Sequence, residues 1–221
     1  MSALESVAFD IETTGFGVGD EVTVAGFALP MGVRVCCQTG GRPATEVTDA
    51  VEERVDATVQ VSTHDSERAL LAAVEDFAAE RLAGSDVLLV AYNGETWQSG
   101  FDLPFLRTRL SRRGVDWPFR DLPYADLMPL VTERFNTTED GERVSDLCGV
   151  YETLCEGPYG DLDPFEESDE AVAAFEDDQF VDLVMHNVAD VLRTRALAGL
   201  AERYCSKSDF RLKSLTPTIH D

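Results

Sequence analysis

Positive charge is what this 221-residue sequence has least of. It contains 18 lysines and arginines against 42 aspartates and glutamates, a formal net charge of −24, and its lysines are Lys207 and Lys213 alone. The acids are spread among apolar segments, which argues against an acidic disordered tail. A basic partner could neutralise them, but we favour adaptation to a cytoplasm at molar salt, where a Debye length of about 3 Å screens self-repulsion. At low salt such a charge would argue against nucleic-acid binding, whereas at molar salt that objection loses force.

Paired cysteines, targeting segments and long apolar runs are also lacking. The five cysteines form no C-x-x-C pair and are odd in number, which argues against structural zinc or a disulfide framework and for reduced thiols. The N-terminal M-S-A-L-E has neither the basic nor the apolar part of a secretion signal. The sequence also contains no run of about 18 apolar residues, the length needed to span a membrane. We therefore expect a cytoplasmic protein with no membrane partner and one domain over residues 1–221.

Hydrophobic spacing predicts an α/β protein. Alternating or continuously apolar segments predict strands at 4–11, 21–29, 33–39, 86–92 and 124–127. Helical spacing predicts helices at 66–83, 103–113 and 179–204. Polar composition predicts loops at 40–63, with at most a short element, and at 156–168. Together these segments predict a mixed sheet whose first three strands are antiparallel, with helices flanking it.

Two carboxylates alternate along the first predicted strand, in the motif F-D-I-E-T-T-G at residues 9–15. Because side chains alternate on a strand, Asp10 and Glu12 project from one face, about 7 Å apart along the chain, while the intervening apolar side chains pack inward. Two carboxylates beside a core are destabilising unless positive charge neutralises them, and a divalent cation with oxygen ligands does so. By itself, a D-x-E pair most often consists of solvated residues at the edge of a sheet.

Two further acidic motifs lie in predicted helices. F-D-L-P-F-L at residues 101–106 places Asp102 at a helix start, where by itself it would be an N-cap. H-N-V-A-D at residues 186–190 places His186 and Asp190 on one helical face, since residues four apart are neighbours on a helix. By itself, this would be a polar pair on a solvated face.

Taken together and in this order, the three motifs resemble those of the ribonuclease-H-like DEDD superfamily of 3′→5′ exonucleases. The F-D-L-P-F-L and H-N-V-A-D-V runs are most similar to the exonuclease domains of family B DNA polymerases and their stand-alone relatives. The resemblance implies a ribonuclease-H-like fold and hydrolysis of phosphodiester bonds at the 3′ end of single-stranded DNA or RNA, with DNA favoured. It also implies a role such as DNA repair, and no organic cofactor.

The resemblance further implies a role for each motif residue. Asp10 would bridge two divalent cations, Mg²⁺ or Mn²⁺. Glu12 and Asp190 would hold the cation that activates water, and Asp102 would support the second one; such a pair of cations suits phosphodiester hydrolysis. His186 resembles the residue that positions and deprotonates the water. It stands four residues before the last aspartate, as Tyr does in the members that use Tyr, whereas members that use His place it five before.

Residues just after the first motif are expected to contact substrate. Thr13, Gly15 and Phe16 match the part of the family that meets the terminal nucleotide. A glycine permits close backbone approach, and Phe16 would either stack at the last base or be a core aromatic. The second-motif helix also carries arginines that could contact phosphate or could complement the helix C-terminus, namely Arg107, Arg109, Arg112 and Arg113.

Two other functions are weighed against the exonuclease. A ribonuclease H-type endonuclease carries its catalytic glutamate on a helix well downstream of the first aspartate, so the D-x-E pair disfavours it. The alternative we keep is a catalytically inactive ribonuclease-H-like module that binds nucleic acid or protein. Loss of an acidic ligand would favour that module, and all four acidic candidates are present.

Overall fold

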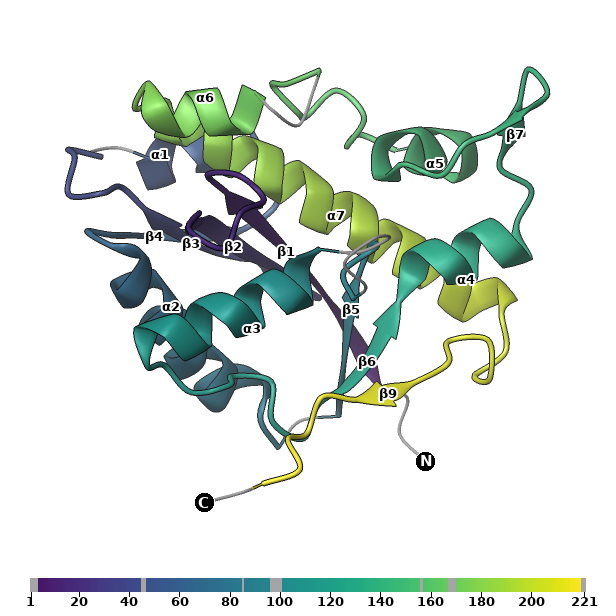
Figure 1. Cartoon of the computed structure of the whole chain (residues 1–221). Helices are drawn as coiled ribbons and strands as arrows, with labels where there is room; N and C mark the ends of the chain where they lie inside the picture. Colours follow the sequence, from purple (N-terminus) through teal and green to yellow (C-terminus); the bar gives the residue numbers. More distant parts are fainter. Residues whose placement is uncertain are drawn as a thin grey trace.

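The first three strands form an antiparallel meander inside a seven-stranded sheet in the computed structural model (Figure 1). The strands are β1 (Glu5–Thr13), β2 (Val22–Leu29), β3 (Gly32–Gln38), β4 (Val59–His64), β5 (Val87–Ala91), β6 (Pro123–Asp126) and β9 (Lys213–Ser214). Their order across the sheet is β4-β3-β2-β1-β5-β6-β9. The pairs β3–β4, β1–β5 and β5–β6 are parallel, and β6–β9 is antiparallel. The structure describes residues 4–44, 47–84, 86–95, 101–155, 157–166 and 170–219.

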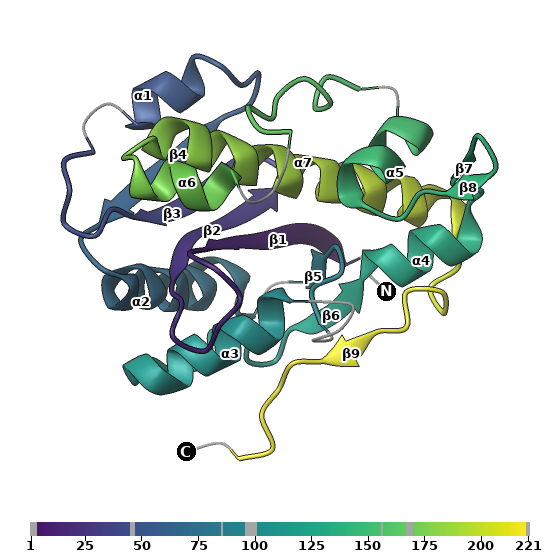
Figure 2. The same cartoon turned by 45° about the horizontal axis from the view of Figure 1, so that its top comes forward.

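Helices cover both faces of this sheet. They are α1 (Val47–Glu52), α2 (Glu67–Phe77) with the π-helical turn η1 (Ala78–Leu82), α3 (Asp102–Arg113), α4 (Leu127–Arg134), α5 (Leu147–Leu154), α6 (Glu170–Glu176) and α7 (Phe180–Tyr204). The long α7 crosses one face over β1 and β2, and α2 and α3 lie against the other (Figures 1 and 2). A separate two-stranded hairpin joins β7 (Thr138–Glu139) to β8 (Glu142–Arg143).

The alternation along β1 separates two hydrophobic cores. Val7, Phe9 and Ile11 are buried in the cluster shared with α2 and α3. Ala8, one residue out of phase, belongs to the cluster shared with α7. Because α7 is packed between the sheet and α1, α4, α5 and α6, it is buried around most of its circumference. The face of β1 that carries Asp10 and Glu12 is therefore the face that α7 covers.

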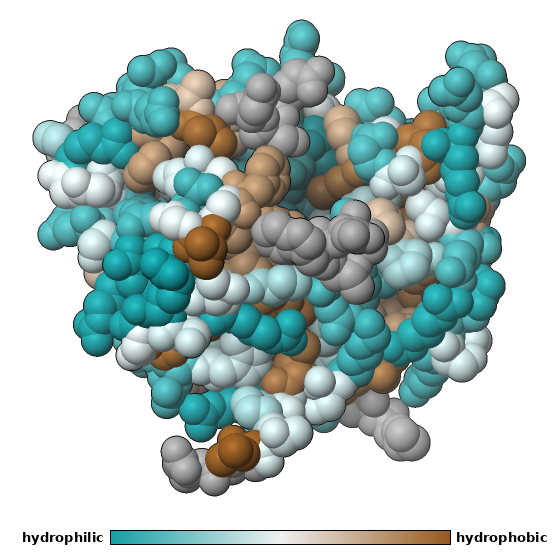
Figure 3. All heavy atoms as spheres, in the orientation of Figure 1, coloured by the Kyte–Doolittle hydropathy of each residue, from teal (hydrophilic) through white to brown (hydrophobic). Residues whose placement is uncertain are grey.

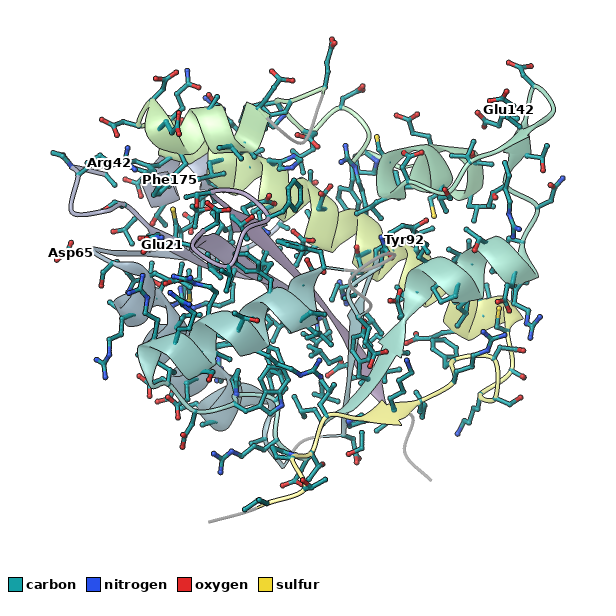
Figure 4. All side chains as sticks on the ribbon, in the orientation of Figure 1. Glu21, Arg42, Asp65, Tyr92, Glu142 and Phe175 are labelled. Atoms are coloured by element: carbon teal, nitrogen blue, oxygen red, sulfur yellow. The ribbon has the colours of Figure 1, made fainter. Side chains whose placement is uncertain are left out.

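Most of the predicted elements are confirmed, with ends that differ by one or two residues. The mixed sheet with an antiparallel start and flanking helices is as predicted. The prediction of a loop at 40–63 is wrong, because this segment contains α1 and the edge strand β4. The short strands β7, β8 and β9 were not predicted either. Figure 4 shows Arg42 beside Phe175, 4.5 Å from the ring centroid, which links the end of β3 to α6.

Among the residues that the structure describes, no helix combines the length and the apolar character needed to cross a lipid bilayer.

Candidate functional site

The two carboxylates of β1 meet an asparagine of α7. Asn187 Nδ2 donates to Asp10 Oδ2 at 2.8 Å and to Glu12 Oε1 at 3.4 Å. Asn187 is fully buried, and its Oδ1 has no hydrogen-bond partner among the described residues. This amide fits because Gly26 lies opposite Asp10 on β2; a Cβ on Gly26 would lie 1.9 Å from Asn187 Oδ1. The amide thus fixes Asp10 and Glu12 side by side.

The third motif faces the same place from α7. His186 Nε2 lies 3.9 Å from Glu12 Oε1 and 4.0 Å from Asp190 Oδ2. The prediction that His186 and Asp190 share a helical face is confirmed, and that face is not solvated, since His186 is only 7% exposed. Asp190 Oδ1 accepts a 2.9 Å hydrogen bond from Arg193, one turn further along α7. One oxygen of Asp190 is therefore held by Arg193, and the other faces His186.

The second motif approaches from the end of α3. Asp102 is the first residue of α3, and Phe101, not Asp102, is the N-cap. The helix start is tied to the end of β5, because Leu103 N–H donates to the Gly94 carbonyl at 2.8 Å. Asp102 is 7% exposed, and its carboxylate is close enough to Asp10 to perturb its ionisation. The structure therefore brings Asp10, Glu12, Asp102 and Asp190 together from three distant parts of the sequence.

The ionisation of these side chains shows a site rich in negative charge. Burial raises the pKa of Asp10 well above its usual value, and Asp102, Glu12 and Asp190 raise it further. The pKa of Asp102 is raised in the same way, by burial and then by Glu12. Burial also raises the pKa of Asp190, to about 6, although His186 opposes the shift. Burial lowers the pKa of His186, but Glu12 and the other carboxylates outweigh it and raise it to about 9.

Glu12, His186 and Asp190 form a cluster that could bind a metal ion, since one ligand atom from each lies within 4.8 Å of the others. A cation here would relieve the repulsion that raises the neighbouring pKa values. The carboxylate donors fit hard divalent ions such as Mg²⁺ and Mn²⁺. In Figure 3, hydrophilic residues cover most of the molecular face seen in the orientation of Figure 1. The arrangement could therefore hold a metal ion.

The residues predicted to contact substrate lie in the turn that follows β1. Thr13 is the last residue of the strand, and its hydroxyl donates to the Gly15 carbonyl at 2.8 Å. Gly15 has a φ of +153°, and a Cβ there would lie 2.8 Å from Asp20 Oδ2. The interpretation of Phe16 as a core aromatic is wrong, because its side chain is 72% exposed. It makes an edge contact with Phe101, with ring centroids 5.2 Å apart.

Two of the four α3 arginines that could have contacted phosphate are engaged with Glu67 instead, and Arg112 and Arg113 stand in the last turn of the helix. Arg109 is buried and makes two hydrogen bonds to Glu67, at 2.6 Å and 2.7 Å. Arg113 also contacts Glu67 and reaches Glu21, which is labelled in Figure 4. Arg107 lies over the ring of Trp117, 4.9 Å from its centroid. Arg109 and Arg113 thus link α2, α3 and the residue before β2, with Arg109 buried and Arg113 partly exposed.

Three site residues were not predicted. Asn187 stands inside the H-N-V-A-D motif, and its position next to His186 was the available signal. Arg193 falls one turn after Asp190, and the i, i+3 spacing would have allowed the pair to be proposed. Asp163 belongs to the loop after α5, and nothing in its local sequence indicates that it reaches His186 Nδ1 at 2.8 Å.

Comparison of the sequence with protein-family models gives no match, and comparison with curated proteins gives none either.

Proposed function

We propose that this protein is a 3′→5′ exonuclease of the ribonuclease-H-like DEDD type, which hydrolyses single-stranded nucleic acid with the help of two divalent cations. The observation that carries the proposal is the convergence of the three motifs: Asp10 and Glu12 from β1, Asp102 from α3 and Asp190 from α7 share one cluster. If the three motifs were unrelated polar pairs on solvated surfaces, their carboxylates would not be expected to lie in one cluster. The strand order, with an antiparallel meander continued by parallel strands, supports the same fold type.

The donor set fits the proposed cations. Asp10, Glu12, Asp102 and Asp190 supply oxygen ligands, and the raised pKa values of Asp10, Asp102 and Asp190 mark a local excess of negative charge. Bound in such a site, two cations would lower the pKa of an attacking water and neutralise the charge of the phosphate. The contribution of Asn187 is to keep the Asp10 and Glu12 carboxylates adjacent before any ligand arrives.

The turn after β1 supports a single-stranded end as substrate. The exposed ring of Phe16 contacts the partly buried Phe101, which directly precedes Asp102, and it offers aromatic surface on which a terminal base could stack. Such stacking does not need long-range attraction, which suits a chain with a net charge of −24. We propose single-stranded DNA over RNA as the preferred substrate, in a DNA repair role.

The test is degradation of 5′-labelled single-stranded DNA and RNA in molar KCl with Mg²⁺ or Mn²⁺. We expect a ladder that shortens from the 3′ end and disappears with a chelator. Asp102→Asn should abolish the ladder, whereas Asp65→Asn, at an exposed position on the loop after β4, should keep it. Substrate untouched by folded protein under every condition would reject the exonuclease and favour a binding module with the same fold.

A further inference from the structure

The Nδ1 side of the His186 ring contacts a carboxylate that lies outside the three motifs, that of Asp163. Its Nδ1 lies 2.8 Å from Asp163 Oδ1, and its ring packs against Phe165, with centroids 5.4 Å apart. Asp163 Oδ2 also accepts a 2.9 Å hydrogen bond from the Arg193 guanidinium, a pairing that favours the ionised carboxylate. An ionised carboxylate accepts hydrogen bonds only, so Nδ1 carries the proton. A neutral His186 therefore presents the lone pair of Nε2 to the site.

Asp163 is itself fixed by a buried arginine. Arg193 Nη1 donates to Asp163 Oδ2 and to Asp190 Oδ1, at 2.9 Å each. Its other nitrogens donate to the carbonyls of Tyr159 and Gly160, at 3.1 Å each. Arg193 is only 1% exposed, so the contacts form inside the protein. One side chain thus anchors the 159–163 segment to α7 and aligns Asp163 with His186.

The Nε2 atom points at two carboxylates without bonding to either. It lies 3.9 Å from Glu12 Oε1 and 4.0 Å from Asp190 Oδ2, and it makes no hydrogen bond to a residue that the structure describes. Ligands of one ion, each at about 2.0–2.2 Å, lie roughly 3–4.4 Å from one another. The two separations fall inside this interval. Both separations from His186 are therefore compatible with a shared ion, and one ligand atom from each of the three residues lies within 4.8 Å of the others.

We propose that His186 Nε2 is a direct metal ligand together with Glu12 and Asp190, that Asp163 is the residue that orients it, and that this position prefers Mn²⁺ to Mg²⁺. Histidine ligands generally donate their second ring N–H to a carboxylate, and that is the geometry of Asp163. Imidazole suits first-row transition metals, whereas Mg²⁺ prefers oxygen ligands alone. The inference rests on the metal site of the proposed function, and it gives His186 a different task from that of a water-activating base.

Mn²⁺ binding tests this assignment directly. Pulsed electron paramagnetic resonance of the Mn²⁺-loaded protein should show modulation from a bound imidazole nitrogen. Titration should give an affinity for Mn²⁺ at least tenfold higher than for Mg²⁺. His186→Gln, which replaces nitrogen by an oxygen ligand, should abolish the nitrogen signal and the preference. His64→Gln, on β4 away from the site, is the matched control and should change neither.

The orienting role of Asp163 has its own variant. Asp163→Ala should lower Mn²⁺ affinity by about 10–100-fold, the usual effect of removing a residue that supports a metal ligand. Asp163→Asn keeps an acceptor for Nδ1 and should recover part of that loss. Circular dichroism checks that each variant is folded. If Mn²⁺ affinity in Asp163→Ala stays within threefold of the wild type, the orienting role is wrong.

The outcomes separate this inference from the exonuclease itself. Cleavage that depends on Asp102, with no nitrogen signal in the wild-type protein, would overturn the ligand assignment and leave the exonuclease standing. A nitrogen signal that His186→Gln removes, in a protein that cleaves neither DNA nor RNA, would support the ligand assignment and reject the exonuclease.

Discussion

Gly26→Ala should damage the site although Gly26 carries no functional group. The new Cβ would lie 1.9 Å from Asn187 Oδ1 and 3.3 Å from Val191 Cγ1. Ordinary contact begins near 3.4 Å, so the Asn187 amide would have to retreat by about 1.5 Å. A 2.8 Å hydrogen bond to Asp10 cannot survive that displacement. The substitution should therefore release the two β1 carboxylates from the amide that holds them.

The expected loss of stability follows from two contributions. Overpacking of a buried position costs about 1–3 kcal/mol, and a lost hydrogen bond to a charged group costs about 1.5–3 kcal/mol. We expect a total near 3 kcal/mol, because partial shifts of the strand and helix relieve some of each. At about 2–4 °C per kcal/mol for a domain of this size, Tm should fall by roughly 6–12 °C.

Thermal unfolding followed by circular dichroism at constant molar KCl measures this change. Gly199→Ala is the matched control: Gly199 lies in α7, and a Cβ there meets no atom within 4 Å. Removing a glycine from a helix should raise stability by up to about 1 kcal/mol. Mn²⁺ affinity should fall in Gly26→Ala and stay unchanged in Gly199→Ala. An unaltered or higher Tm for Gly26→Ala would refute the close packing of Asn187 on β2.

Three other perturbations have defined outcomes. Glu67→Gln leaves the buried Arg109 charge without its ionised partner and should lower the free energy of unfolding by about 3–5 kcal/mol, measured with denaturant. The control Glu133→Gln removes an exposed ion pair and should cost under about 1 kcal/mol. Equal losses would contradict the burial of the Arg109–Glu67 pair. Dilution toward 0.1 M salt should unfold the chain because its net charge of −24 is less screened, and an unchanged circular-dichroism spectrum would argue against adaptation to high salt. In the presence of a chelator, Tm should fall as pH rises, because the raised pKa of Asp190 lowers stability as pH rises to about 6, and the stabilising contribution of protonated His186 is lost between pH 6.5 and about 9. Saturating Mn²⁺ should flatten this pH profile. A Tm that rises with pH in chelator would contradict the local excess of negative charge.

The sequence predicted elements whose apolar spacing is strong. The run at 86–92 became β5, buried on both faces, and the periodic segment at 179–204 became α7 within one residue at its start. β4 was missed because V-Q-V-S-T-H carries few apolar residues. An edge strand pairs on one side only and exposes part of its side chains, so it needs few apolar residues. The residues between β3 and β4 carry no sequence pattern that would predict the pairing of these two strands.

For the candidate site too, local relations between residues could be predicted and long-range contacts could not. The motif spacing placed Asp10 with Glu12 and His186 with Asp190, because strand and helix periodicities fix those relations locally. Asp163 could not be predicted, since its contact with His186 depends on how the 157–166 segment folds back on α7. The two interpretations of the α3 arginines could not be separated from sequence for a related reason. Their number indicated a charged surface, whereas burial against Glu67 decides which of them solvent can reach.

The contact between Asn187 and Asp10 joins residues 177 positions apart, and this separation determines when the candidate site can assemble. The β1 carboxylates emerge first during synthesis, but their partners on α7 arrive only after residues 180–204 have been made. Until α7 docks on β1 and β2, the β1 carboxylates lack every partner that α7 supplies, and loop-closure entropy over such separations slows folding. Under the proposed exonuclease function, a nascent chain would therefore be inactive until its last long helix has docked.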